Sequence, residues 1–191
     1  MRIFPVLILA IVLAGCGDRS WNGKDISHLM PPLEFELTDE TGAAVDQSIF
    51  EGRPVAIYFG FTQCPDICPM TLAKLAAAAR GLPPEQRERL QLAFVSVDPD
   101  RDTPARLTEY TGAFSDAMLG LTGTQRQLQA LTRRYRITYG YEEPDADGNY
   151  EVSHSSAIFV FNEALDAELM LLDNLLIDEM KADLERLLGK S

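Results

Sequence analysis

The chain of 191 residues predicts an α/β domain in which helices cover a central β-sheet. Two apolar runs, at residues 54–61 and 90–98, carry this prediction because they lack the polar alternation of half-exposed strands. Segments in which apolar residues recur at helical spacing lie between and after these runs. Buried strands separated by amphipathic helices are typical of a sheet enclosed between helix layers.

The composition suits a folded domain and excludes one class of partner. Hydrophobic residues make up 46% of the chain, enough for a full core, and charged residues make up 24%. The formal net charge is −12, whereas nucleic-acid binding needs a basic face. The same acidity excludes a polybasic domain attracted to an anionic membrane surface.

The N-terminal residues predict export and a lipid anchor. Residues 4–12 are an apolar run too short to span a membrane, and the small residues after them precede Cys16. The sequence LAGC resembles a bacterial lipoprotein signal box, so we expect residues 1–15 to be a signal peptide and Cys16 to be lipidated. The alternative is an ordinary or uncleaved signal peptide in which Cys16 is incidental. With the lipid, residues 16–31 form a tether, and the domain is membrane-anchored outside the cytoplasm, on the periplasmic side.

The first predicted elements are a hairpin, a strand and a helix. Residues 33–38 alternate as LEFELT and, after a turn, residues 43–46 return, which predicts a β-hairpin. The central strand at 54–61 leads into a helix over 66–80, and the proline pair at 83–84 ends that helix.

The second half predicts further helices and strands. Thr103 followed by Pro104 indicates a helix N-terminus, with the helix running to residue 114. The remaining predicted elements are a tight connection at 119–123, a helix at 124–135, a short edge strand at 137–141, a strand at 156–161 with a hairpin partner at 167–172, and a final helix after Asn174. The order is the thioredoxin pattern, so we expect residues 32–191 to form a thioredoxin-like sheet flanked by helices, with an N-terminal β-hairpin extension.

Two cysteines follow the central strand. Cys64 and Cys68 are each followed by proline, and their spacing is Cys-x-x-x-Cys rather than the Cys-x-x-Cys of disulfide oxidoreductases. With Cys16 assigned to the anchor, the pair is alone in an oxidising compartment, where it forms a disulfide, binds a metal or alternates between the two. We expect both cysteines on one helix face, near an N-terminus that stabilises thiolate.

The available ligands favour copper over zinc. Thiolates select Cu(I), zinc or iron–sulfur clusters, and two cysteines are too few for a structural zinc site. The chain has two histidines: His28 lies in the expected tether, and His154 directly precedes the strand at 156–161. In a thioredoxin-like fold that position lies beside the active-site cysteines, but spacing alone leaves His154 open as a ligand or as an exposed loop residue. Met70 is a softer candidate that we interpret as a packing residue.

Four motifs carry a resemblance to a known family. They are YFGFTQCPDICP at 58–69, VSVDPDRDTP at 95–104, GLTG at 120–123 and SHSS at 153–156. In this order and spacing, over about residues 32–187, the chain resembles the Sco/SenC family of copper-binding, thioredoxin-like assembly factors.

The resemblance implies roles for particular residues. Cys64 and Cys68 would be the copper-ligating and redox-active cysteines, and His154 the third ligand. Asp98 would lie near the site, either behind the ligands or as a turn residue at the strand end. Asp102 and Thr103 are most simply interpreted as helix-capping residues.

Two positions depart from the family pattern. Many members have His where this chain has Gln63, and many have Asp where it has Ser153. Neither position ligates copper in the family, but either could tune ligand orientation or redox poise. The departures leave open an altered metal preference or a mainly redox role. Members are also often held by a membrane helix rather than by a lipid.

The resemblance implies a copper metallochaperone, which is a delivery protein rather than an enzyme. It would bind copper, as Cu(I) or Cu(II), and pass it to an extracytoplasmic acceptor, for which the resemblance suggests the CuA site of cytochrome c oxidase subunit II or another copper protein. The alternative is a thiol–disulfide oxidoreductase that reduces the acceptor's cysteines. A peroxidase-like redoxin needs a peroxide-activating constellation around one cysteine, and the sequence offers none.

Overall fold

One eight-stranded mixed sheet organises the domain, in the order β1-β10-β9-β4-β5-β6-β2-β3. The computed structural model describes residues 20–143, 150 and 152–189. The strands are β1 (Lys24–Asp25), β2 (Glu36–Asp39), β3 (Ala44–Asp46), β4 (Val55–Gly60), β5 (Gln91–Ser96), β6 (Met118–Thr122), β9 (Ile158–Phe161) and β10 (Ala167–Leu171). The central strands β4, β5 and β6 are parallel, and antiparallel strands extend the sheet on both sides. The predicted central sheet is therefore confirmed.

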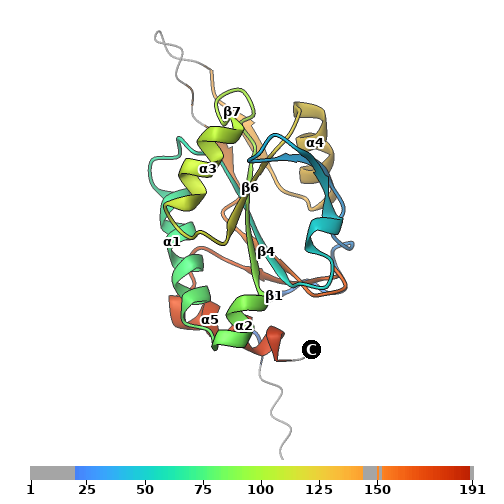
Figure 1. The fold of residues 1–191 in the computed structure, drawn as a ribbon, viewed down its shortest axis with the longest axis vertical. Coiled ribbons are helices and arrows are strands. Elements are labelled where there is room, and N and C mark those ends of the chain that lie inside the picture. Colours follow the sequence, from blue (N-terminus) through green and yellow to red (C-terminus); the bar gives the residue numbers. More distant parts are fainter. Residues whose placement is uncertain (1–19, 144–149, 151, 190–191) are drawn as a thin grey trace, which may run out of the picture.

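Helices cover both faces of this sheet. They are α1 (Ile67–Arg80), α2 (Pro84–Arg89), α3 (Pro104–Gly112), α4 (Gln125–Arg134) and α5 (Ile177–Leu188), with a 3₁₀ turn η1 at Gln47–Phe50. Figure 1 shows α1, α3 and α5 on one side of the sheet and α4 on the other. Right-handed crossovers explain the shared side of α1 and α3, because each connects neighbouring parallel strands in the same direction along the sheet. In the part of the chain that is described, no helix is long and apolar enough to cross a bilayer.

Strand β4 is buried on both faces, as its unbroken apolar sequence predicts. Every one of its residues is buried. Tyr58 stacks on Phe94 beneath α1 and α3, with ring centroids 6.4 Å apart. On the opposite face Phe59 meets Phe159 edge-to-face at 6.0 Å, and Tyr135 at the end of α4 packs against the same ring.

Two elements differ from their prediction. Residues 119–123, expected to be a tight connection, lie largely within β6, a core strand that pairs with both β5 and β2. The five-residue strand MLGLT is short and carries a central glycine, both of which weaken a strand signal. The proline pair at 83–84 ends α1 as expected, but Pro84 also occupies the first turn of α2.

The expected tether at 16–31 is partly wrong, because the described chain is already docked before residue 31. Strand β1 pairs with β10 at the sheet edge, and Ile26 is only 2% exposed. The buried carboxylate of Asp183 on α5 accepts hydrogen bonds from the backbone N–H of Asn22 at 3.1 Å and of Gly23 at 2.8 Å. Cys16 and the predicted signal peptide lie outside the described residues.

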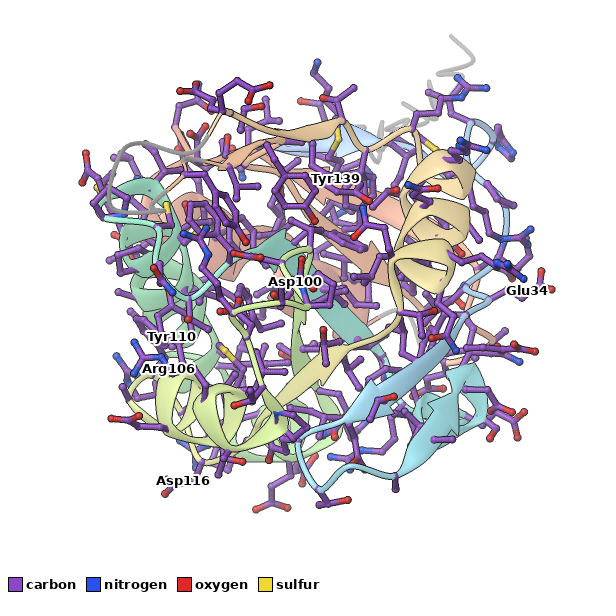
Figure 2. All side chains as sticks on the ribbon, turned by 90° about the horizontal axis from the view of Figure 1, so that it is seen from above. Glu34, Asp100, Arg106, Tyr110, Asp116 and Tyr139 are labelled. Atoms are coloured by element: carbon purple, nitrogen blue, oxygen red, sulfur yellow. The ribbon has the colours of Figure 1, made fainter. Side chains whose placement is uncertain are left out.

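A small second sheet stands apart from the main one. Strands β7 (Tyr139–Tyr141) and β8 (Val152–His154) form an antiparallel pair, with His154 opposite Tyr139. The expected edge strand at 137–141 is therefore a strand, but it does not belong to the main sheet. In Figure 1 β7 lies at the top of the molecule, and Figure 2 looks down on that end, with Tyr139 and Asp100 labelled.

Candidate metal centre

The cysteine loop, residues 61–68, begins where β4 ends and finishes inside α1. Because α1 starts at Ile67, Cys64 lies in the turn before the helix and Cys68 is the second helical residue. The expectation that both cysteines share one helix face is therefore wrong. They are instead adjacent across the helix N-terminus, where the backbone N–H of Cys68 donates to the Sγ of Cys64 at 3.4 Å.

Both cysteines are in the reduced thiol form, and they differ in exposure. Cys64 is half-buried, whereas Cys68 is 0% exposed. Gly60 makes room for the buried sulfur, because a Cβ at this position would lie 2.7 Å from the Sγ of Cys68. The Tyr58 hydroxyl donates to the same sulfur at 3.7 Å. Cys64 is thus the accessible thiol and Cys68 the enclosed one.

Burial dominates the acidity of Cys68. Desolvation raises its pKa from the ordinary value of 9.0 to about 12, and the neighbouring Cys64 thiol adds to this shift. Hydrogen bonds from the Phe61 backbone and the Tyr58 hydroxyl oppose the shift without cancelling it. The predicted stabilisation of thiolate by the helix N-terminus therefore does not prevail at Cys68. This thiol is protonated at neutral pH in the metal-free protein.

Asp102 fastens the start of the cysteine loop to β5. Its carboxylate is 0% exposed and accepts from the Thr62 N–H at 2.8 Å, the Thr62 hydroxyl at 2.6 Å and the Ser96 hydroxyl at 2.6 Å. The interpretation of Asp102 as a helix cap is wrong. The capping role of Thr103 is confirmed, because its hydroxyl accepts from the Arg106 N–H at 3.3 Å. The role of Asp102 is invisible in sequence because Thr62 is 40 residues away.

Asp98 lies where β5 ends and is also 0% exposed. Its Oδ2 accepts from the Nε of Arg101 at 2.5 Å, and its Oδ1 accepts from the Tyr150 hydroxyl at 2.8 Å. Asp98 therefore ties the end of the main sheet to the chain that leads into β8. The sequence alone identified Asp98 but neither Arg101 nor Tyr150. Arg101 lies within the VSVDPDRDTP motif, whereas Tyr150 lies in none of the four motifs.

The structure brings the segment around His154 to the cysteine loop. A hollow of about 470 Å³ is lined by Cys64 and Ile67 on one side and by Val152, Ser153 and Ser156 on the other. These last three residues flank His154, whose backbone lies in β8 and whose side chain is outside the described part. Among the described side chains, no three His, Cys, Asp or Glu are grouped to hold a metal ion.

Two other candidates from the sequence do not join this hollow. His28 is exposed in the turn after β1 and is not part of the lining. Met70, interpreted as a packing residue, is 46% exposed on α1, so that interpretation is wrong.

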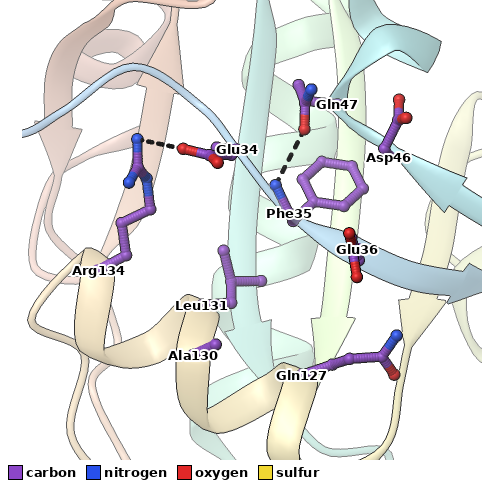
Figure 3. Close-up of a pocket in the computed structure, with 9 residues that line it drawn as sticks. All are labelled: Glu34, Phe35, Glu36, Asp46, Gln47, Gln127, Ala130, Leu131 and Arg134. Atoms are coloured by element: carbon purple, nitrogen blue, oxygen red, sulfur yellow. Dashed lines mark hydrogen bonds and ion pairs between the residues drawn. The ribbon is translucent and has the colours of Figure 1, made fainter.

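A separate hollow of about 410 Å³ lies between β2, η1 and α4 (Figure 3). Arg134 pairs with Glu34 at 2.8 Å along its rim, and the Phe35 N–H donates to Gln47 at 3.1 Å. Its lining residues, all within the described ranges, include no cysteine or histidine. This hollow has no soft donor, so the cysteine loop is the better candidate for a metal centre.

The fold and the site together define a thioredoxin-like protein with a Cys-x-x-x-Cys pair at the N-terminus of α1. The family model described as SCO1/SenC matches residues 29–189. The chain therefore belongs to the SCO1/SenC family, as its motifs indicate.

Known proteins of this family resemble the chain in sequence and structure. A mitochondrial SCO2 homologue of Bos taurus is 41% identical over 135 residues, which is 68% of this chain and 49% of that protein. The chain thus spans about half the length of the mitochondrial relatives it matches. The structure of Bradyrhizobium japonicum ScoI with copper bound superposes with a TM-score of 0.74 at 30% identity, covering 82% of this chain and 99% of that one. Apo Sco1 from Thermus thermophilus gives a TM-score of 0.79 at 34% identity, covering 90% and 99%.

Proposed function

We propose that this protein is a copper metallochaperone that binds Cu(I) through Cys64, Cys68 and His154. The observation that carries the proposal is the shared hollow, in which Cys64 faces the residues on both sides of His154. Two thiolates and one imidazole form a soft, low-coordinate donor set that suits Cu(I). The copper-bound ScoI structure, which shares the fold at 30% identity, supports the same choice of metal.

The two cysteines would play unequal parts in taking up and releasing the metal. Cys64 is the half-buried thiol and faces the open hollow, so an incoming or outgoing thiolate would reach it first. Cys68 is enclosed, and it must lose its proton when copper binds. Release to an acceptor would return a proton to this buried sulfur, which leaves the reduced dithiol ready for another metal ion.

The acceptor would be an extracytoplasmic copper protein. Family membership supports the CuA site of cytochrome c oxidase subunit II. A lipid on Cys16, in the LAGC sequence, would hold the domain on a membrane surface outside the cytoplasm.

The test is a Cu(I) titration of the purified, reduced protein against a competing chelator. We expect one Cu(I) per chain and a severe loss of affinity in His154→Ala. His28→Ala is the matched control, because the exposed His28 does not line the hollow and its loss should leave affinity unchanged. Stoichiometric binding that His154→Ala leaves unaffected would reject the three-ligand site.

A second assay addresses the role of the same dithiol as a reductant. An oxidised CuA apo-domain is mixed with the reduced protein, and its free thiols are counted. Reduction of that domain by a protein that binds no copper would replace the delivery role with thiol–disulfide exchange.

A further inference from the structure

Three segments that are distant in sequence converge on the guanidinium of Arg101. They are the cysteine loop, the end of β5 and the chain that enters β8. The Arg101 side chain is 17% exposed, so its contacts are largely shielded from water. We infer that Arg101 is a positioning residue that holds β8, and with it His154, against the cysteine loop. The inference rests on the proposed copper site and assigns to Arg101 the geometry of its third ligand.

Arg101 makes its shortest aromatic contact with Tyr150, in the segment that leads into β8. The guanidinium carbon of Arg101 lies 3.7 Å from the centre of the Tyr150 ring, which is a cation–π arrangement. Its Nη1 also donates to the Tyr150 carbonyl at 3.0 Å. Both the ring and the backbone of Tyr150 are therefore fixed, four positions before His154 and two before the first residue of β8.

The same guanidinium contacts the cysteine loop. Nη1 donates to the Oε1 of Gln63 at 3.3 Å, and the Phe61 ring centre lies 5.7 Å from the guanidinium carbon. Gln63 directly precedes Cys64. One nitrogen of Arg101 thus bridges the residue next to a proposed ligand and the segment that leads into the strand carrying another.

Asp98 fixes the orientation of the Arg101 guanidinium. It accepts from the Nε of Arg101 at 2.5 Å through one oxygen and from the Tyr150 hydroxyl at 2.8 Å through the other. The three side chains contact one another in a closed cluster, in which the Asp98 side chain is 1% exposed. Lysine could keep the charge near Asp98, but it could not stack its head flat on Tyr150 while donating in three directions.

A role confined to local stability makes a different prediction from a positioning role. If Arg101 only neutralised Asp98, its loss would weaken the domain and leave the geometry of copper binding unchanged. If it positions β8, its loss should weaken the His154 contribution specifically. The Cys64–Cys68 pair should keep its redox properties, because Asp102 and β4 hold that side independently.

The experiment is a double-mutant cycle on Cu(I) affinity with the full-length, reduced protein, in Arg101→Lys, His154→Ala and the double variant. We expect Arg101→Lys to weaken Cu(I) binding about 10- to 100-fold in the wild-type background, the range for residues that orient metal ligands. In the His154→Ala background we expect little further loss. X-ray absorption of the Arg101→Lys copper complex should show a reduced nitrogen contribution, with the reduction potential of the dithiol unchanged.

Two further variants keep the test decisive. Tyr150→Leu removes the aromatic face but leaves the Arg101–Asp98 pair, so it should reproduce the effect if Arg101→Lys fails to fold. Arg126→Gln is the matched control, because Arg126 is an exposed arginine on α4 and should bind copper as the wild type does.

The outcomes separate this inference from the proposed function. Wild-type binding that depends on His154 but not on Arg101 or Tyr150 would overturn only the inference. Equal losses with and without His154, or a shifted dithiol potential, would also overturn it, because Arg101 would then act on the cysteines. No copper binding by the wild type, or no effect of His154→Ala, would reject the three-ligand site itself and the inference with it.

Discussion

The two sides of the hollow beside Cys64 are built in different ways. The cysteine loop continues a fully buried strand of the main sheet and enters α1. Two hydrogen bonds from Thr62 fasten it to the buried carboxylate of Asp102, which also accepts one from Ser96 on β5. The β7–β8 pair belongs to a separate two-stranded sheet. In the described part of the chain, the side-chain links from this pair and from the segment leading into β8 to the end of β5 include the Tyr141 hydroxyl, which donates to the Val97 carbonyl at 2.5 Å, and the cluster of Arg101, Asp98 and Tyr150.

The difference in attachment predicts which side of the site is rigid and which side can adjust. A two-stranded sheet is marginally stable in water by itself. The placement of the β7–β8 pair, here called the ribbon, therefore depends on the few polar contacts that attach it. The thiols, in contrast, share the stability of the core. Substitutions on the cysteine side should therefore lower global stability, and substitutions on the ribbon should act locally.

The largest effect is expected from Asp102→Ala. It leaves the Thr62 N–H, the Thr62 hydroxyl and the Ser96 hydroxyl without their buried acceptor, and hydrogen bonds to charged groups contribute about 1.5–3 kcal/mol each. Because such contributions are not additive, we expect the free energy of unfolding to fall by roughly 3 kcal/mol or more in urea denaturation. Asp100→Ala, on the exposed part of the same loop, should change it by less than about 0.5 kcal/mol. Similar losses in both variants would contradict the assigned role of Asp102.

A smaller global effect is expected from Gly60→Ala. The added methyl would lie 2.7 Å from the Sγ of Cys68 and 3.1 Å from a Phe94 ring carbon, and overpacking of this kind costs about 1–3 kcal/mol. Thermal unfolding and the rate of Cys68 alkylation by a thiol reagent provide the measurement, with lower stability and faster alkylation expected. In Gly112→Ala the methyl meets nothing within 4 Å, so stability should be unchanged or slightly raised. Unchanged stability in Gly60→Ala would mean that the sulfur can move freely.

The burial of Cys68 predicts an alkaline loss of stability. Its folded pKa of about 12 lies above the ordinary 9.0, so folding favours the protonated thiol. This contribution is complete below pH 9 and is lost as the pH rises toward 12, at roughly 1 kcal/mol between pH 9 and pH 10. The measurement is the difference in unfolding free energy between wild type and Cys68→Ala across this window, which cancels other titrating groups. A constant difference would show that the thiol titrates alike in both states.

The smallest effect, and the only one expected to stay within the ribbon, belongs to Tyr141→Phe. The substitution removes the hydroxyl that donates to Val97, a contact of about 0.5–1.5 kcal/mol. Hydrogen exchange should accelerate at the β7–β8 amides by severalfold while protection in β4 and β5 is kept. Phe59→Leu in the core is the contrasting control, since it should lower protection throughout the sheet. Uniform loss of protection in Tyr141→Phe would mean that ribbon and sheet open together.

The main strands and most helices could be predicted because their signals are local. The run at 54–61 is apolar throughout, and Thr103 with Pro104 marks a helix start that the structure confirms. Strand β6 was not predictable in the same way, because its burial comes from neighbours on both sides rather than from its own five residues.

The site was predictable only in part, for a physical reason. Two cysteines at the start of a helix indicate reactive thiols, but the roles of Asp102 and Arg101 depend on partners 40 and 49 residues away. The raised pKa of Cys68 likewise depends on enclosure beneath Gly60 and Tyr58, which the helix-terminus rule does not include. The ligand role of His154 remains a prediction of the family motif, supported by the position of β8.

The contacts that begin at Trp21 limit the distance between the domain and a lipid on Cys16. Trp21 already packs on Arg186, with the guanidinium carbon 4.4 Å from its ring centre, so only four residues of sequence separate Cys16 from this contact, rather than the fifteen or so expected of the tether. The five steps from Cys16 to Trp21 span at most about 18 Å for a fully extended chain. A lipid on Cys16 would therefore keep the domain nearly in contact with its bilayer, and only acceptors whose metal sites stand close to that same surface would be within range.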